Sequence, residues 1–203
     1  MIETNSLVNT DWVENHLEDD DITIVEVNSH PEQSYLKGHI PSSILWDLHK
    51  DLEDQIKRDI PSGTDMEKLM GNSGITNETT IILYGDGNNR SATWAFWLLR
   101  FYRHTKIKLI DGGRVKWLIE GKPVTSEIPK PKPANYQIKP PDKAIRATLS
   151  YIIKNLNRND LRIIDTRTIE EYLGEMASSP GTPQTGIAKN GRIPNSVNIQ
   201  WTD

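Results

Sequence analysis

The chain of 203 residues contains no cysteine. This absence excludes disulfide bonds, thiolate metal sites and any cysteine nucleophile supplied by these residues. Long apolar runs are also missing, because the longest candidate for a membrane span covers only residues 95–99. The amino terminus lacks the basic and apolar regions of a secretory signal. We therefore expect a soluble, cytoplasmic protein that does not enter a membrane.

An excess of charge of one sign is missing as well. The 24 basic and 28 acidic residues leave a formal net charge of −4, and the basic residues do not gather into a stripe. Neither a nucleic acid nor an anionic membrane surface is therefore expected as a partner. We expect no cofactor and no metal site. The length allows one large domain or two small ones.

What the chain does contain is one pattern written twice. Glu26-Val27-Asn28 corresponds to Asp165-Thr166-Arg167, which lies 139 residues later, and Gly38-His39-Ile40-Pro41 corresponds to Gly191-Arg192-Ile193-Pro194, which lies 153 residues later. The difference places a 14-residue insertion in the Ala177–Asn190 region. A period this long indicates duplicated domains. The second copy continues only about ten residues past this pattern, so we expect one whole domain followed by the opening of another.

Segments typical of strands and helices alternate along the chain. β-branched and aliphatic runs predict buried strands, and capping or acidic residues before apolar positions predict helices. Such alternation is typical of βαβ units, so the expected fold class is α/β with an open parallel sheet flanked by helices. The expected strands are residues 22–27, 43–46, 79–84, 107–110 and 161–165. One helix is expected to start at Asp11. The other expected helices cover residues 64–72, 90–103, 114–120, 147–157 and 168–172, and a capping box from Thr64 to Glu67 is expected at the start of the helix at 64–72. A loop is expected at 178–191.

Proline-rich composition separates the two expected domains. Five prolines between residues 126 and 142 predict an extended, semi-rigid connector. We therefore expect a first domain at residues 5–125, a linker at 126–143 and a partial second domain at 144–203. Because so small a domain is marginal, the second is expected to be poorly ordered unless it docks on the first domain or pairs with another polypeptide.

The loop after the strand at 79–84 is the place where chemistry is expected. Ligands bind at the carboxyl ends of the strands of an open parallel sheet. Here a glycine-rich loop, residues 85–89, leads into the amino terminus of a helix, where backbone amides can converge on an anion. A cysteine in such a loop would be acidified into a good nucleophile.

Taken in order, the short patterns of the chain resemble the rhodanese sulfurtransferases, most closely the two-domain bacterial thiosulfate sulfurtransferases. The resemblance runs from about residue 5 to the end. It depends on Gly38-His39-Ile40-Pro41, Tyr84-Gly85-Asp86, Trp94-Ala95-Phe96-Trp97, Asp111-Gly112-Gly113-Arg114 with Trp117, Gly121 and Pro123, Asp165-Thr166-Arg167 with Glu170-Glu171-Tyr172, Pro180-Gly181, and Gly191-Arg192-Ile193-Pro194.

The resemblance implies a reaction and also implies that its nucleophile is missing from this chain. In that family a cysteine takes sulfur from thiosulfate as a persulfide and passes it to cyanide or a thiol. The cysteine begins a pattern like Cys-x-x-x-x-Arg-Ser, and this chain keeps Arg90-Ser91 but has Gly85 in the cysteine position. The amino-terminal copy is normally inactive in two-domain members. The matching loop of the second copy is expected near position 238, beyond Asp203, so these residues are expected to be inactive alone.

The expected roles of individual residues follow from the same comparison. Arg167 is the best candidate for binding the oxygens of a small anionic sulfur donor. Arg90 could coordinate an oxyanion, although pairing with a nearby acid is favoured. Asp86 could act as an acid or hold a metal, although accepting hydrogen bonds from loop amides is favoured. Relatives that use mercaptopyruvate carry a second arginine four residues after the first, and Glu171 in that place favours thiosulfate.

Other polar residues are expected to be structural. His39 is interpreted as a histidine that stabilises its turn. Glu26 and Asp165 end equivalent strands and are expected to accept backbone amides. The aromatic helix at 90–103 is expected to be a core helix of the first domain, with one side meeting the second domain.

Three readings of the function remain open from the sequence. The chain is an incomplete sulfurtransferase that needs a further segment or a protein partner to complete its second domain. Alternatively, it is a non-catalytic rhodanese-fold module that binds a protein or an anion. The third reading is a gene fragment without a selected role. A phosphatase on the same fold would need the same loop cysteine and is equally excluded for these residues.

Overall fold

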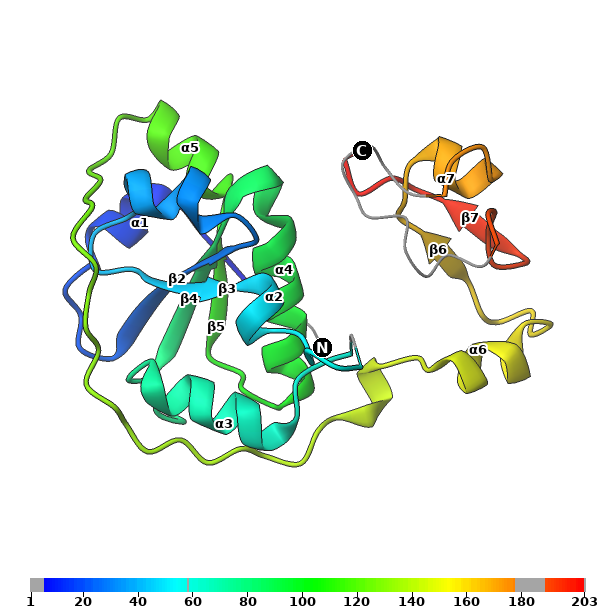
Figure 1. Ribbon diagram of the computed structural model, residues 1–203, viewed down its shortest axis with the longest axis horizontal. Helices are drawn as coiled ribbons and strands as arrows, with labels where there is room; N and C mark the ends of the chain where they lie inside the picture. The colour runs from blue at the N-terminus through cyan, green and yellow to red at the C-terminus, as the bar shows by residue number, and fades with distance from the viewer. Residues whose placement is uncertain (1–5, 58, 178–188, 203) are drawn as a thin grey trace. The chain divides into compact units, whose positions relative to one another are not determined.

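The computed structural model describes residues 6–57, 59–177 and 189–202, which form two compact units, 1–146 and 147–203 (Figure 1). The insertion predicted in the Ala177–Asn190 region and most of the loop predicted at 178–191 lie outside the described residues. No helix within the described ranges is long and apolar enough to span a membrane. The helices of the first unit are α1 (Thr10–Glu14), α2 (Leu48–Asp51), α3 (Gly63–Asn72), α4 (Asp86–Phe101) and α5 (Gly113–Ile119).

A five-stranded sheet forms the centre of the first unit. Its strand order is β1-β5-β4-β2-β3, and all neighbouring strands are parallel, which confirms the predicted α/β fold. The central positions of β2 and β4 bury them on both faces and explain their aliphatic sequences. The strands are β1 (Leu7–Val8), β2 (Ile22–Asn28), β3 (Ile44–Asp47), β4 (Thr80–Tyr84) and β5 (Ile107–Ile110), of which only the two-residue β1 was not predicted.

Helices cover both faces of this sheet (Figure 1). On one face α1 and α5 contribute Val13 and Trp117 to the core, and on the other α3 and α4 contribute Met66 and Leu98. Each of these side chains is almost fully buried, and burial of one such side chain contributes about 1.5–3 kcal/mol. The aromatic helix predicted at residues 90–103 corresponds to α4, and the expectation that it belongs to the core of the first unit is confirmed.

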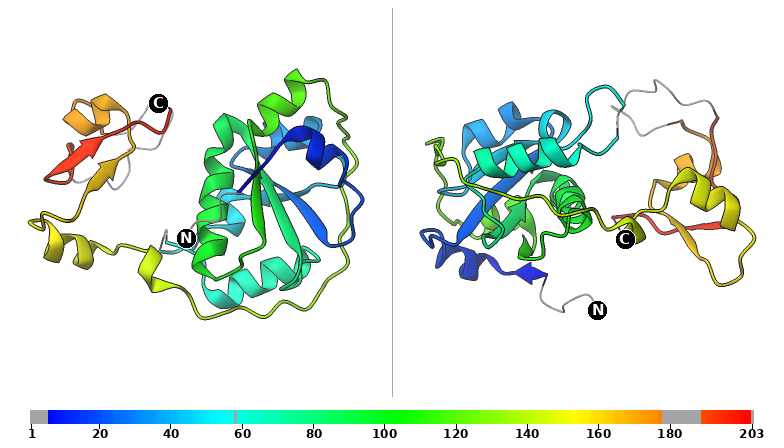
Figure 2. Two further views of the ribbon diagram at one scale, coloured as in Figure 1. Left: turned by 180° about the vertical axis from the view of Figure 1, so that it is seen from behind. Right: turned by 90° about the horizontal axis from the view of Figure 1, so that it is seen from below.

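The proline-rich segment at residues 126–142 belongs to the first unit and passes α3 (Figure 2). The backbone N–H of Ala134 donates to the Gly71 carbonyl at 2.9 Å. Tyr136 is buried, and its hydroxyl lies 3.3 Å from Nδ1 of His104. The segment is extended, as its composition predicts, and it also contributes a side chain to the core of the first unit.

Helices α1 and α3 each begin one residue before the predicted one, because different side chains cap them. Asn9 caps α1, so this helix starts at Thr10. The hydroxyl of Ser62 accepts the N–H of Asp65 at 3.2 Å, and α3 therefore starts at Gly63. The capping box predicted from Thr64 to Glu67 was wrong, because Ser62 provides the cap two residues earlier.

The second unit is small and has almost no buried side chains. Its two strands form a parallel pair, and both of its predicted helices are present. Of the described residues after 146, only Ser196 is buried. The elements are α6 (Leu149–Asn155), β6 (Ile163–Asp165), α7 (Ile169–Leu173) and β7 (Ser196–Asn198).

Corresponding residues of the two units make corresponding contacts. The hydroxyl of Tyr35 donates to the Ser43 carbonyl at 2.8 Å, and the hydroxyl of Tyr172 donates to the Ser196 carbonyl at 2.7 Å. Each contact fixes the turn that leads into a strand paired with the strand before it. The two turns therefore have the same local architecture.

Candidate functional site

The loop after β4 is closed by its own side chains. Residues Gly87, Asn88 and Asn89 have left-handed φ angles of 55°, 54° and 64°, so the regular part of α4 begins only at Arg90. The side chain of Asn89 is buried, with Oδ1 accepting the N–H of Gly85 at 3.0 Å. Its Nδ2 donates to the carbonyl of Ile110 at 2.8 Å. The amide at the start of the loop is therefore already occupied from within.

Gly85 stands where only a glycine fits. A Cβ atom built on this residue would lie 2.5 Å from the backbone carbonyl oxygen of Val27. Real Cβ atoms do not approach a backbone atom so closely, so either the loop or β2 would have to move. The position that the family resemblance assigns to a cysteine is thus sterically closed to every side chain.

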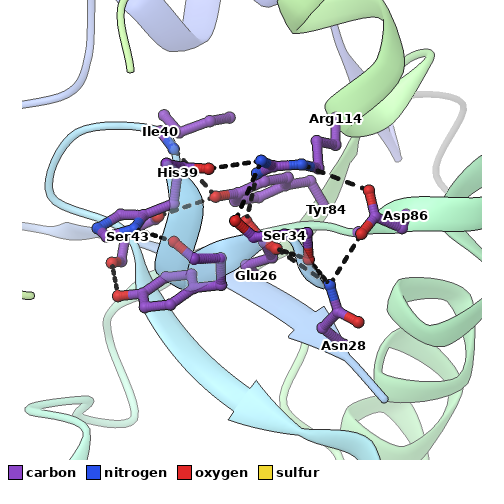
Figure 3. Close-up of polar contacts among 12 residues, drawn as sticks. Glu26, Asn28, Ser34, His39, Ile40, Ser43, Tyr84, Asp86 and Arg114 are labelled. Carbon is purple, nitrogen blue, oxygen red and sulfur yellow. Dashed lines mark hydrogen bonds and ion pairs between the residues drawn. The ribbon is translucent and has the colours of Figure 1, made fainter. Parts of the chain in front are cut away.

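Asp86 is held by side chains and not by the predicted loop amides. Its Oδ2 accepts Nδ2 of Asn28 at 3.0 Å, and its Oδ1 lies 3.4 Å from Nε of Arg114 (Figure 3). The side chain of Asp86 is 44% exposed. The prediction was wrong, because the donors that reach this carboxylate are side chains at the end of β2 and on α5. Asp86 is therefore interpreted as a structural carboxylate just beyond the carboxyl end of β4.

A buried ion pair connects the sheet to α5. Nη1 of Arg114 lies 3.1 Å from Oε2 of Glu26, and the two side chains are 10% and 0% exposed. Arg114 also donates to the carbonyls of Gly38 and Ser34 (Figure 3). In a low-dielectric interior, such a pair is tolerated only when hydrogen bonds satisfy its remaining donors and acceptors, and here they do.

Glu26 was predicted to accept backbone amides, and this was wrong. Its Oε1 accepts Nδ2 of Asn28 at 3.2 Å and the hydroxyl of Ser34 at 3.3 Å, in addition to the pair with Arg114. Arg114 is part of the Asp-Gly-Gly-Arg pattern in the sequence, but no role was predicted for it. That pattern was the one signal in the sequence that pointed to Arg114. Its partner Glu26 could not be predicted, because only the fold brings the two side chains together.

The turn at Gly38–Pro41 is stabilised by aromatic and imidazole groups, as predicted for His39. Nδ1 of His39 lies 2.8 Å from the Tyr35 carbonyl and Nε2 lies 3.0 Å from the Glu127 carbonyl, while the ring stacks on that of Tyr35. The hydroxyl of Tyr84 lies 2.9 Å from that of Ser43. Burial, reinforced by the charge of Glu26, raises the pKa of Tyr84 well above its usual range. The phenol is therefore a neutral hydrogen-bonding group.

The second unit presents Arg167 in a fixed orientation. Its Nε and Nη2 contact Oδ1 and Oδ2 of Asp165 at 3.0 and 2.6 Å, and Nη2 also donates to the Gly191 carbonyl at 2.8 Å. Asn198 donates to the carbonyls of both Asp165 and Arg167 at 2.9 Å. Hydrogen bonding to the guanidinium lowers the pKa of Asp165, so this carboxylate is ionised. The Arg167 side chain is 40% exposed.

The remaining predicted residues lie near these two groups. Asp165 accepts the backbone N–H of Arg167 at 3.1 Å, as predicted, and it also binds the guanidinium. Arg90 is exposed at the start of the regular part of α4. Glu171 forms a capping box with Thr168, which fixes the first turn of α7. The fold brings Gly85 and Asp86 together with Glu26 and Arg114, and Arg167 lies in the other unit.

Within the described ranges no group of three or more histidine, aspartate or glutamate side chains is placed to hold a metal ion. The polar side chains around the loop after β4 bind one another, and the side chain of Arg167 in the second unit is 40% exposed.

The comparisons with known proteins agree with the fold and with the family resemblance. A model of the rhodanese-like domain matches residues 9–120. The chain belongs to the rhodanese family. The sulfur carrier protein TtuD of Thermus thermophilus is 40% identical over 199 residues, which cover 96% of this chain and 69% of that protein. A Mycobacterium leprae protein, provisionally named a thiosulfate sulfurtransferase, is 36% identical over 202 residues and is covered to 72% of its length.

Solved structures show the same fold at lower identity. SseA from Escherichia coli, a 3-mercaptopyruvate sulfotransferase with the rhodanese fold, matches with a TM-score of 0.81 at 23% identity, covering 98% of this chain and 76% of that one. YnjE matches with a TM-score of 0.81 at 21% identity, and the match covers 48% of its chain. At this level of identity the likeness concerns the fold alone.

Proposed function

We propose that this chain is the non-catalytic part of a sulfurtransferase that moves sulfane sulfur from thiosulfate, and that its 203 residues are inactive alone. The observation that carries the proposal is the absence of cysteine together with the closed position at Gly85. A persulfide intermediate needs a thiolate cradled by main-chain amides. The amide of Gly85 is instead bound by Asn89.

The second unit supports a role in binding the sulfur donor. We propose that Arg167 binds the anionic oxygens of the donor, because its planar guanidinium is oriented by Asp165 and remains 40% exposed. The matching tyrosine contacts support the interpretation that this unit is a tandem copy of the start of the first. Arg167 would then occupy the strand end that Asn28 occupies in the first copy.

Thiosulfate is the donor that we propose. Glu171, four residues after Arg167, places a negative charge beside the guanidinium and caps α7. Relatives that use mercaptopyruvate carry a second arginine at this place, and the carboxylate of Glu171 cannot replace that arginine in binding the carboxylate of mercaptopyruvate. The name of the Mycobacterium leprae relative points to thiosulfate as well.

The alternative of an anion-binding module in the first unit has less support. A bound anion would need free donors in the loop, whereas Arg114 is engaged by Glu26 and Asp86. The added carboxylate of Asp86 would also repel an anion at this edge.

A thiocyanate assay tests the proposed function. The purified 203-residue protein is incubated with thiosulfate and cyanide, and no thiocyanate should form above the rate without protein. Donor binding is measured separately by calorimetry with thiosulfate, and Arg167→Met should abolish the heat, whereas Arg162→Met, an exposed arginine of the same unit, should not. Turnover that scales with protein and survives a second purification would contradict the proposal.

A further inference from the structure

Residues 131–142, which we call the strap, close over the end of α4 in the first unit. The strap runs in an extended path past α3 (Figure 1). Tyr136 is 4% exposed and belongs to the core, whereas its neighbours Asn135 and Gln137 are exposed. Tyr136 is the one buried residue of the strap, and it is therefore the main anchor of this segment.

Hydrogen bonds at the surface hold the rest of the strap in place. The backbone N–H of Ala134 donates to the Gly71 carbonyl, and that of Ile138 donates to Oε2 of Glu67, both at 2.9 Å. Each such bond contributes only about 0.5–1.5 kcal/mol, because water can take its place. The strap can therefore leave the surface without unfolding the sheet, provided that Tyr136 leaves the core.

The contact of Tyr136 with His104, which we call the latch, is made between two neutral groups. His104 follows the end of α4 and is 3% exposed. Its Nε2 lies 3.0 Å from the Thr79 carbonyl, which can only accept, so this nitrogen carries the proton. Nδ1 is then the acceptor for the Tyr136 hydroxyl, 3.3 Å away. Burial raises the pKa of Tyr136 to about 12, so the phenol keeps its proton.

The surroundings of His104 oppose a second proton on its ring. Burial, together with the charges of Lys139 and Lys106, lowers the pKa of His104. Arg103, the residue before it, adds a positive charge at the surface. The carboxylate of Glu78 faces the same region, but it is 84% exposed and is already bound to Nζ of Lys106 at 2.8 Å. A protonated His104 would be a buried cation beside other cations, and only contact with water would relieve it.

We propose that the strap is a pH-sensitive device, in which protonation of His104 displaces Tyr136 and releases residues 131–142 from the first unit while the sheet stays folded. Release exposes the imidazolium to water. It also lengthens the chain between the two units, because the second unit begins at residue 147. The freed residues could extend this connector by up to about 40 Å. The device does not depend on the proposed function.

Hydrogen exchange of the strap amides in the full chain tests this proposal. The amides of Ala134, Gln137 and Ile138 all donate to the first unit. Their protection, corrected for the intrinsic exchange rate at each pH, should fall several-fold between about pH 7.5 and about pH 5.5, with a limit of about tenfold set by the ordinary histidine pKa of about 6.5. The amides of β4 should stay better protected than the strap at both pH values.

Three variants assign the effect to the latch. His104→Gln keeps a donor for the Thr79 carbonyl and cannot become charged, so its strap should have equal protection at both pH values. His49→Gln alters an exposed histidine of the same unit and should retain the fall. Tyr136→Ala removes the anchor and should release the strap at both pH values, which tests the device even if His104→Gln does not fold.

Three outcomes would overturn the proposal. The first is equal strap protection at the two pH values in the parent chain, or the same fall in His104→Gln. The second is a loss of protection that extends equally to β4, because the whole unit would then be unfolding. The third is strap protection that Tyr136→Ala leaves unchanged.

Discussion

Replacing Arg114 by methionine is the sharpest test of how the first unit is held together. Methionine keeps the length of the side chain and removes its charge. Glu26 would then remain buried without its counterion, because its side chain is 0% exposed. The carbonyls of Gly38 and Ser34 would lose a donor at the same time.

The size of the effect follows from these contacts. Removing one partner of a buried ion pair costs about 3–5 kcal/mol. Asn28 and Ser34 still donate to the carboxylate, so we expect the lower end, about 3 kcal/mol. A single domain has only about 5–15 kcal/mol of stability in total. The double variant Glu26→Gln with Arg114→Met removes both charges and should recover part of the loss.

Urea unfolding, followed by the fluorescence of the buried Trp46 and Trp117, measures these free energies. Arg103→Met is the matched control, because Arg103 is 53% exposed and lies 3.8 Å from Asp142. That variant should change stability by about 0.5 kcal/mol or less. A loss below about 1 kcal/mol for Arg114→Met would refute the argument that the ion pair is structurally essential.

Three further predictions concern other parts of the chain. Gly85→Cys should yield no thiocyanate and should destabilise the first unit by about 1–3 kcal/mol, since its Cβ collides with the Val27 carbonyl; turnover in the thiocyanate assay would contradict the closed loop. Burial lowers the pKa of His104, so the unfolded chain takes up a proton before the folded chain does as the pH falls. The free energy of unfolding should therefore be at its full value above about pH 6.5 and should decrease below it until the lowered pKa is reached. Urea unfolding at a series of pH values should show this decrease in the parent chain and not in His104→Gln. Brief trypsin digestion should cut within residues 147–203 before it cuts the first unit, because the second unit has no buried apolar side chain among its described residues. Uniform resistance through residue 203, measured by mass spectrometry, would contradict this.

Local patterns predicted the central elements of the fold well. The strand at 107–110 has its predicted bounds, and the strand at 79–84 differs by one residue, because aliphatic runs in a parallel sheet carry their own signal. The regular part of the helix after β4 begins at Arg90, as predicted, but the three successive left-handed residues before it were not predicted. Sequence periodicity does not encode such a turn, although two of its residues are asparagines, which tolerate this conformation.

The candidate site was harder to predict than the fold. Gly85 and Asp86 were singled out correctly as positions in the loop, but their partners come from distant parts of the chain. Arg114 contacts Glu26, which lies 88 positions earlier in the sequence, and no local pattern around either residue predicts this pair. Proline content predicted an extended connector and could not show that Tyr136 enters the core beside His104.

The hydrogen bonds and ion pairs around the loop after β4 limit how the first unit could evolve by mutation. One codon change at position 85 would introduce a thiol into space that the Val27 carbonyl already fills. The carboxamide of Asn89 would still hold the main chain in its present path. Recovery of sulfur chemistry here would require several coordinated replacements, so inheritance by single steps should preserve the inert state.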